Sequence, residues 1–70
     1  MKTGAGGRWL VVYMCRGRRK LEEVERMLTD EGFLVRSRAL ERGMGEGAYE
    51  ICTLEAEAQE ARNFLLEKGL

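Results

Sequence analysis

The segment Arg8-Trp-Leu-Val-Val-Tyr-Met-Cys15 decides the fold of this chain. It is rich in aromatic and β-branched residues and too short to form a helix by itself, so it predicts a strand that is apolar on both faces. Its run of seven apolar residues, Trp9 to Cys15, falls far short of the roughly 18 needed to span a bilayer. We therefore expect a strand of a soluble domain and no membrane helix.

A helix is expected after this strand, over residues 17–31. Its apolar positions recur at helical spacing among charged residues, and they are Leu21, Val24, Met27 and Leu28. Gly32 stands where a left-handed residue commonly ends a helix, and Phe33 just beyond it can contact Leu28 as in a Schellman ending.

The remaining sequence predicts a β-hairpin and a second helix. Residues 33–40 (FLVRSRAL) alternate in their middle like a half-exposed strand, and residues 48–53 (AYEICT) read as its partner. Between them, residues 41–47 (ERGMGEG) carry the glycines of a turn. Thr53 is placed to cap the last helix, which ends near Gly69. The apolar stripe of that helix is Leu54, Ala58, Ala61 and Leu65, beside Phe64.

The expected fold is α+β with the order βαββα. A right-handed crossover either joins the first two strands as parallel neighbours or leaves a gap between them. We favour the gap, which the third strand fills antiparallel to both. The spatial order is then 1-3-2 with both helices on one face, a ferredoxin-like split-βαβ arrangement without its fourth strand. We expect residues 1–7 to form a flexible tail and residues 8–70 a single domain.

Composition limits what so small a chain can be. A domain of 70 residues has a thin core. Two cysteines and no histidine are too few for a closed zinc site, so we expect neither a metal nor a cofactor. No secretory signal is evident, which predicts the cytoplasm and reduced thiols. Cys15 and Cys52 fall towards opposite ends of the expected sheet, so no disulfide should join them.

Charge is balanced overall but unevenly distributed. Twelve basic and twelve acidic residues cancel, which argues against a general polyanion binder. Ten basic residues stand against six acidic ones through Arg42, and two against six from Gly43 onward, so +4 balances −4.

Basic residues gather where the first strand meets the first helix, and the expected topology brings two arginines to the same end of the sheet. This candidate ligand site is Arg16, Gly17, Arg18, Arg19, Lys20, Arg38 and Arg42. A helix start offers free N–H groups and a positive dipole end, so the pattern favours an anionic small molecule. Cations at a helix start are locally unfavourable, which hints at a use, although solvated charge runs are common.

Catalysis is not indicated. Without histidine the commonest general base is missing, and Ser37 has no evident base to activate it. Cys15, beside Arg16, is the one plausible nucleophile, but a cysteine that ends an apolar strand is more often a packing residue. We expect a protein that is not an enzyme.

The first strand is also the expected interface. It lies at an edge of the sheet and carries neither charge nor proline from Trp9 to Cys15. Whichever side faces the helices, large apolar side chains project from the other, so a homodimer is expected through Trp9, Leu10, Val11, Val12, Tyr13 and Met14. The set on the bare side would be either Trp9, Val11 and Tyr13 or Leu10, Val12 and Met14.

The leading expectation is a small regulatory or interaction module that senses an anionic metabolite at the basic residues or binds a protein partner. A nucleic-acid-binding module is the alternative function. Trp9 and Tyr13, together with Arg36 and Arg38, could form a stacking platform on the sheet.

The pattern Trp9-Leu-Val-Val-Tyr-Met, a charged helix, Glu31-Gly-Phe-Leu-Val-Arg, and Tyr49-Glu-Ile before an acidic helix resembles short bacterial proteins of clostridial type. It is similar to the family described as prokaryotic signal-transducing proteins, a domain of unknown function. The likeness covers residues 8–66. It implies the βαββα fold and a regulatory or binding role, and it carries over no catalytic residue and no ligand.

Overall fold

The computed structural model describes residues 7–40 and 47–70. Its elements follow one another as β1 (Trp9–Arg16), α1 (Arg18–Asp30), β2 (Arg36–Ala39), β3 (Ala48–Leu54) and α2 (Glu55–Glu67). The chain is therefore α+β with the expected order βαββα.

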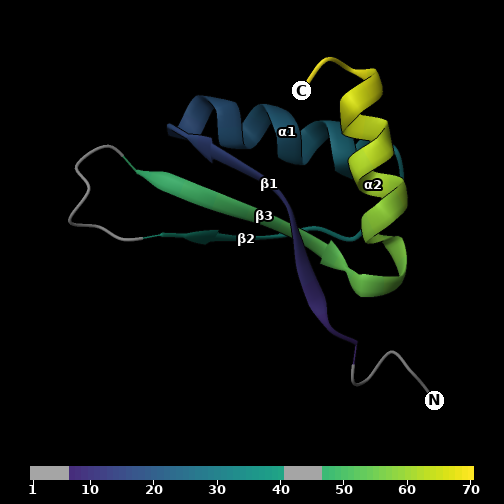
Figure 1. Ribbon diagram of the computed structural model, residues 1–70. Helices are drawn as coiled ribbons and strands as arrows, with labels where there is room; N and C mark the ends of the chain where they lie inside the picture. Colours follow the sequence, from purple (N-terminus) through teal and green to yellow (C-terminus); the bar gives the residue numbers. More distant parts are fainter. Residues whose placement is uncertain (1–6, 41–46) are drawn as a thin grey trace.

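The three strands form one sheet in the order β1-β3-β2, with β3 antiparallel to both neighbours. Both helices lie on one face of this sheet (Figure 1). The predicted strand order and helix placement are thus confirmed. The expected tail and most of the expected hairpin loop fall on residues 1–6 and 41–46, outside the described residues.

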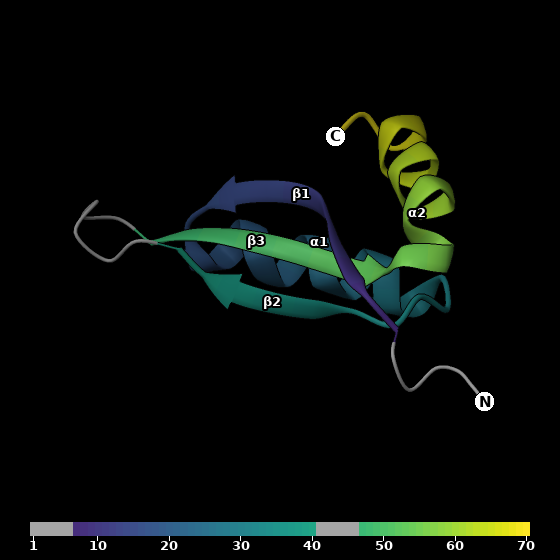
Figure 2. The ribbon, with the colours of Figure 1, turned by 60° about the horizontal axis from the view of Figure 1, so that its bottom comes forward.

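A β-bulge interrupts β1. Val11 pairs with Cys52 and Tyr13 pairs with Ile51, so Val12 is an extra residue between consecutive pairs. Both views show β1 bending along its length (Figures 1 and 2), as a bulge makes a strand do.

The bulge changes which side chains face the helices. Val12, Tyr13 and Cys15 all pack against the core on the helix side. Trp9 and Val11 line a groove on the other side. Met14 alternates with Tyr13 and Cys15, so it points away from the helices as well. Neither expected set for the bare side was right, because a strict alternation of period two ignores the extra residue.

Helix α1 begins and ends where its glycines allow. Gly17 precedes it with φ 93°, and Gly32 follows it with φ 103°. The amide of Phe33 donates to the carbonyl of Leu28 at 3.0 Å and the amide of Gly32 donates to that of Thr29 at 3.0 Å, which is the Schellman pattern. The predicted helix ending is therefore confirmed.

The end of β3 differs from the prediction. The strand continues to Leu54, and it is Leu54 that precedes α2, without a side-chain capping hydrogen bond. Thr53 is fully buried, and its hydroxyl donates to the carbonyl of Leu54 at 3.3 Å. The assignment of Thr53 as the helix cap was wrong because its side chain points into the core.

Strand β2 is also shorter than the expected residues 33–40. Phe33 and Val35 lie before the ladder with β3 begins, yet both pack against the core. Their apolar character reflects burial in the core. The sequence pattern alone does not distinguish a buried residue from one that is paired in a strand.

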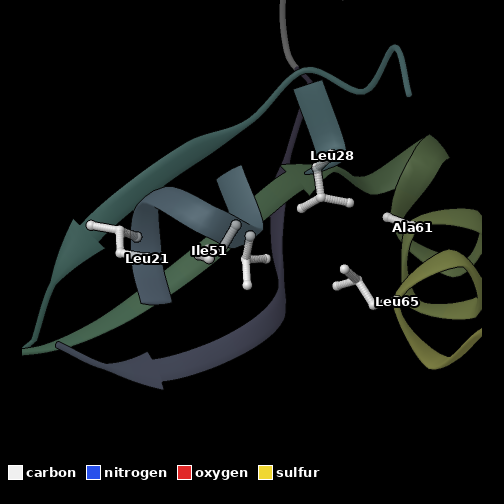
Figure 3. Packing of buried hydrophobic residues seen from close by; sticks show 6 residues of the cluster. Leu21, Leu28, Ile51, Ala61 and Leu65 are labelled. Carbon is white, nitrogen blue, oxygen red and sulfur yellow. The ribbon is translucent and has the colours of Figure 1, made fainter. Parts of the chain in front are cut away.

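The core lies between the sheet and the two helices (Figure 3). Its buried cluster comprises Leu21, Val24, Leu28, Ile51, Ala61 and Leu65. Leu28 of α1 lies across from Ala61 and Leu65 of α2, while Ile51 comes from the central strand. Among the described residues, neither helix has the length and apolarity needed to cross a membrane.

Candidate functional site

The face of the sheet opposite the helices is the main candidate site, and we call it the bare face. It carries Trp9, Val11 and Met14 from β1, Glu50 and Cys52 from β3, and Arg36 and Arg38 from β2. All of them except Met14 line a shallow groove of about 180 Å³. Met14 is 60% exposed at the rim of this face.

A cation–π contact organises one end of the bare face. The guanidinium carbon of Arg36 lies 4.5 Å from the centroid of the Trp9 ring. These residues come from the two outer strands, and their register partners on β3 are Leu54 and Cys52. The two side chains therefore lean towards each other and meet over β3, with the guanidinium against the indole ring.

An ion pair occupies the middle of the bare face. A guanidinium nitrogen of Arg38 donates to Glu50 at 2.8 Å. The Glu50 side chain is only 17% exposed, whereas that of Arg38 is 73% exposed. The carboxylate is therefore held at the base of the face, with an arginine above it that remains open to solvent.

The outer edge of β1 is only partly free. A guanidinium nitrogen of Arg62, on α2, donates to the carbonyl of Val11 at 2.9 Å. The amide of Glu55 donates to the carbonyl of Arg8 at 2.7 Å, which continues the β1–β3 ladder one pair beyond Trp9 and Leu54 and leaves the outer edge untouched. Helix α2 thus covers this edge at Val11, through Arg62. No other described element lies along the C-terminal half (Figure 2).

The basic residues at the start of α1 form a second candidate site. The first turn contains no acidic residue and no side chain caps it. Arg18 and Arg19 are exposed, and the Lys20 ammonium lies 3.7 Å from Glu23. The amide of Gly17 donates to the carbonyl of Gly47 at 2.8 Å, so it is not available to a ligand.

The structure does not bring the predicted ligand residues into one cluster. Strand alternation places Arg16 and Arg38 on the bare face, where Arg38 pairs with Glu50. Arg18, Arg19 and Lys20 belong to the helix layer behind the sheet. Arg42 lies outside the described residues. Among the described members of the set, the sheet separates Arg16 and Arg38 on the bare face from Arg18, Arg19 and Lys20 in the helix layer.

The predicted stacking platform is also divided. Trp9 lies on the bare face, whereas Tyr13 packs against the core on the helix side, as does Tyr49. The platform therefore has one aromatic residue among the described residues, flanked by Arg36 and Arg38.

Neither cysteine is chemically activated. Both thiols are free, and burial is the main cause that raises the pKa of Cys15 and of Cys52 above the ordinary value of 9.0. The charge of Lys20 opposes this effect at Cys15 but does not outweigh it. A thiol that stays protonated near neutral pH is a poor nucleophile. Within residues 7–40 and 47–70 no cluster of side chains suits a metal ion.

An acidic groove lies between the end of α1 and α2. Its floor is formed by Phe33 and Phe64, whose ring centroids are 6.1 Å apart. The acidic residues that line it are Glu31, Glu57, Glu60 and Glu67. The Lys68 ammonium lies 5.4 Å from the Phe64 ring, so a cation of the chain itself already sits beside this floor.

Two residues of the candidate site were not predicted from the sequence. Arg62 contacts Val11, beside the bulge of β1, from 51 residues away along the chain, and no local pattern signals such a contact. Glu50 was not predicted either, although its position opposite Arg38 in the hairpin register could have suggested the pair.

Comparison with known proteins adds no relative to this picture. No family model matches the chain, and neither a curated protein nor a solved structure matches it.

Proposed function

We propose that this protein is a small regulatory or interaction module that works as a homodimer, with the bare face and the open half of the β1 edge as its binding surface. The observation that carries the proposal is an apolar set on an edge strand, facing away from the helices, in which Trp9 and Val11 are half-buried and Met14 is exposed. Soluble monomers rarely leave such side chains together in water unless the surface is used.

The fixed geometry of the bare face supports binding rather than catalysis. The stacked Arg36–Trp9 pair and the Arg38–Glu50 pair are formed before any partner arrives. A surface whose side chains are already ordered loses less conformational entropy on association. A thin core also gains from a second subunit, because binding that favours the native state raises its stability.

The regulatory part of this proposal comes from the sequence resemblance to prokaryotic signal-transducing proteins. Free thiols fit the reducing cytoplasm, where we place the module.

Light scattering at high micromolar concentration tests the proposal. The native chain should have the mass of a dimer, and Met14→Lys should lower that mass by charging the apolar face. Leu66→Lys is the matched control, because Leu66 is similarly exposed, at 68%, but lies on α2 in the helix layer and is not part of the bare face. A native chain that remains monomeric defeats the proposal.

Binding of an anionic small molecule at the start of α1 is a second candidate function. The favouring observation is a first turn with exposed Arg18 and Arg19, no acidic residue and no side-chain cap. A thermal-shift screen with phosphate, nucleotides and small carboxylates tests it, because a ligand of the native state must raise the unfolding temperature. The shift should vanish in the double variant Arg18→Ser/Arg19→Ser and persist in Arg26→Ser. If no compound raises the unfolding temperature, this candidate function is ruled out.

The nucleic-acid alternative retains one aromatic residue and the arginines of the bare face. Binding to RNA or DNA that falls steeply with salt would favour it over the protein-interaction module, because counterion release governs such affinity. If the protein does not bind RNA or DNA at low salt, this alternative is ruled out.

A further inference from the structure

The backbone of β1 offers a second copy one specific place to pair, an inference that rests on the proposed homodimer. Hydrogen-bonded positions alternate along an antiparallel strand. The bond from Gly17 to Gly47, just past the pair of Arg16 with Ala48, fixes which residues face β3. Tyr13 and Cys15 then direct their amide and carbonyl groups at β3, and Met14 and Arg16 direct theirs outward.

We propose that two copies pair antiparallel through Met14 and Arg16, with Cys15 on the two-fold axis. Met14 of one copy lies opposite the partner's Arg16, and the reverse pair is generated by the symmetry. All four outward amides and all four outward carbonyls of these residues lie at the seam. The two three-stranded sheets become one six-stranded sheet.

Neighbouring registers are excluded by features of β1. A register centred on Met14 would place the partner's Arg16 opposite Val12, the bulged residue, next to the Val11 carbonyl that Arg62 already occupies. A register centred on Arg16 would set two arginines directly opposite each other, which is destabilising. It would also require pairing with Arg18, which lies in α1. The register centred on Cys15 avoids all of these conflicts.

Charge complementarity favours the same register. Arg38, Glu50 and Met14 lie side by side across the bare face, because each is the register partner of the next. In the dimer the partner's Arg16 continues this row beside Met14, two strand spacings from Glu50. The Arg36 and Trp9 side chains already meet across that same number of strands. Glu50 thus receives a second arginine, and the exposed Met14 lies between the two chains.

The proposed axis makes a distance prediction for Cys15. Its outward-facing neighbours form the hydrogen-bonded pairs, so Cys15 and the partner's Cys15 form a non-hydrogen-bonded pair with Cα atoms about 4.5 Å apart. That separation lies within the range that a disulfide accepts. Cys52 is on the central strand and cannot meet its counterpart in this arrangement.

Oxidative cross-linking tests the register directly. With copper phenanthroline and air as the oxidant, the native chain and Cys52→Ser should form a covalent dimer on a non-reducing gel, and Cys15→Ser should not. Both thiols have a raised pKa, so the oxidation is run at pH 9. Cross-linking through Cys52 would overturn the register.

Dimer dissociation constants from sedimentation provide a second test that does not depend on thiol reactivity. Arg16→Glu places a carboxylate beside the partner's Glu50 and should weaken the dimer about tenfold or more. Arg26→Glu is the matched control, because Arg26 is also exposed but lies further along α1, away from the seam, and it should leave the constant within about twofold. Met14→Pro removes an outward amide while leaving the β1–β3 ladder its own donors, and it should give a folded monomer by circular dichroism.

The outcomes separate this inference from the proposed function. A native monomer at high micromolar concentration overturns both. A native dimer that neither cross-links through Cys15 nor responds to Arg16→Glu overturns the register alone and leaves a module that associates through its bare face.

Discussion

Leu28→Ala should remove most of the stability of this protein. Leu28 has no exposed surface and packs between α1, the sheet and α2. Three carbon atoms are lost, which at about 0.8 kcal/mol each gives roughly 2.4 kcal/mol. Because surrounding side chains fill such a cavity only partly, the total cost should reach about 3–4 kcal/mol. A domain of this size holds only about 3–5 kcal/mol in its core.

Urea unfolding followed by circular dichroism measures this loss. With a slope near 1 kcal/mol per molar, the midpoint should fall by about 3 M. Leu66→Ala is the matched control, because Leu66 is 68% exposed on α2, and it should change stability by less than about 0.5 kcal/mol. Protein concentration is held fixed so that dimerisation affects all three chains alike. A Leu28→Ala midpoint within about 1 M of the native one would refute the packing of both helices on a shared core.

Three further predictions concern backbone, face and thiols. Gly17→Ala should lower the free energy of unfolding, measured with urea, by about 1–2 kcal/mol, because φ is 93° there and an added Cβ would meet no atom whose contact could offset the strain. Arg36→Ala should cost about 0.5–1 kcal/mol and shift the fluorescence of Trp9, the single tryptophan, whereas an unchanged spectrum would contradict the stacked pair. Burial raises the pKa of Cys15 and Cys52 above 9.0. The stability that the neutral thiols contribute is therefore complete below pH 9.0 and is lost as the pH rises past the pKa values of the folded state. Faster thiol labelling in the native chain than in urea at about pH 8 would contradict this.

The sequence predicted the architecture well because its signals are local or topological. Gly32 stops α1 by its own backbone preference, and the apolar periodicity of α1 follows from burying one face. Crossover handedness and a short hairpin allowed two strand orders, with the first two strands as neighbours or with a gap between them. The gap that we favoured, filled by the third strand, is the observed order.

The faces of β1 could not be predicted in the same way. Seven consecutive apolar residues give no sign of where an extra residue enters the ladder. The position of Val12 depends on how β1 meets β3 and on the arginine that α2 brings to Val11, and both are tertiary effects. One inserted residue is enough to move Tyr13 to the helix side and divide the expected stacking platform.

The candidate ligand site was predicted in part for a related reason. Arg16 and Arg18 are close in the sequence, yet Gly17 turns the chain from the sheet into the helix layer between them. The sequence shows that basic residues cluster along the chain. Only the three-dimensional structure shows that they are divided between the sheet and the helix layer.

The contact between Arg62 and Val11 bears on how this sheet resists uncontrolled growth. An open strand edge is a template on which further chains can add, and long apolar edges are prone to aggregate. Here the bulge bends β1, and Arg62 of α2 occupies the Val11 carbonyl on its outer edge. The opposite edge, β2, has only four residues and carries Arg36 and Arg38. Fibril-like stacking therefore finds no long free edge in the described part of the chain, and Arg62→Ala would lengthen the one that exists.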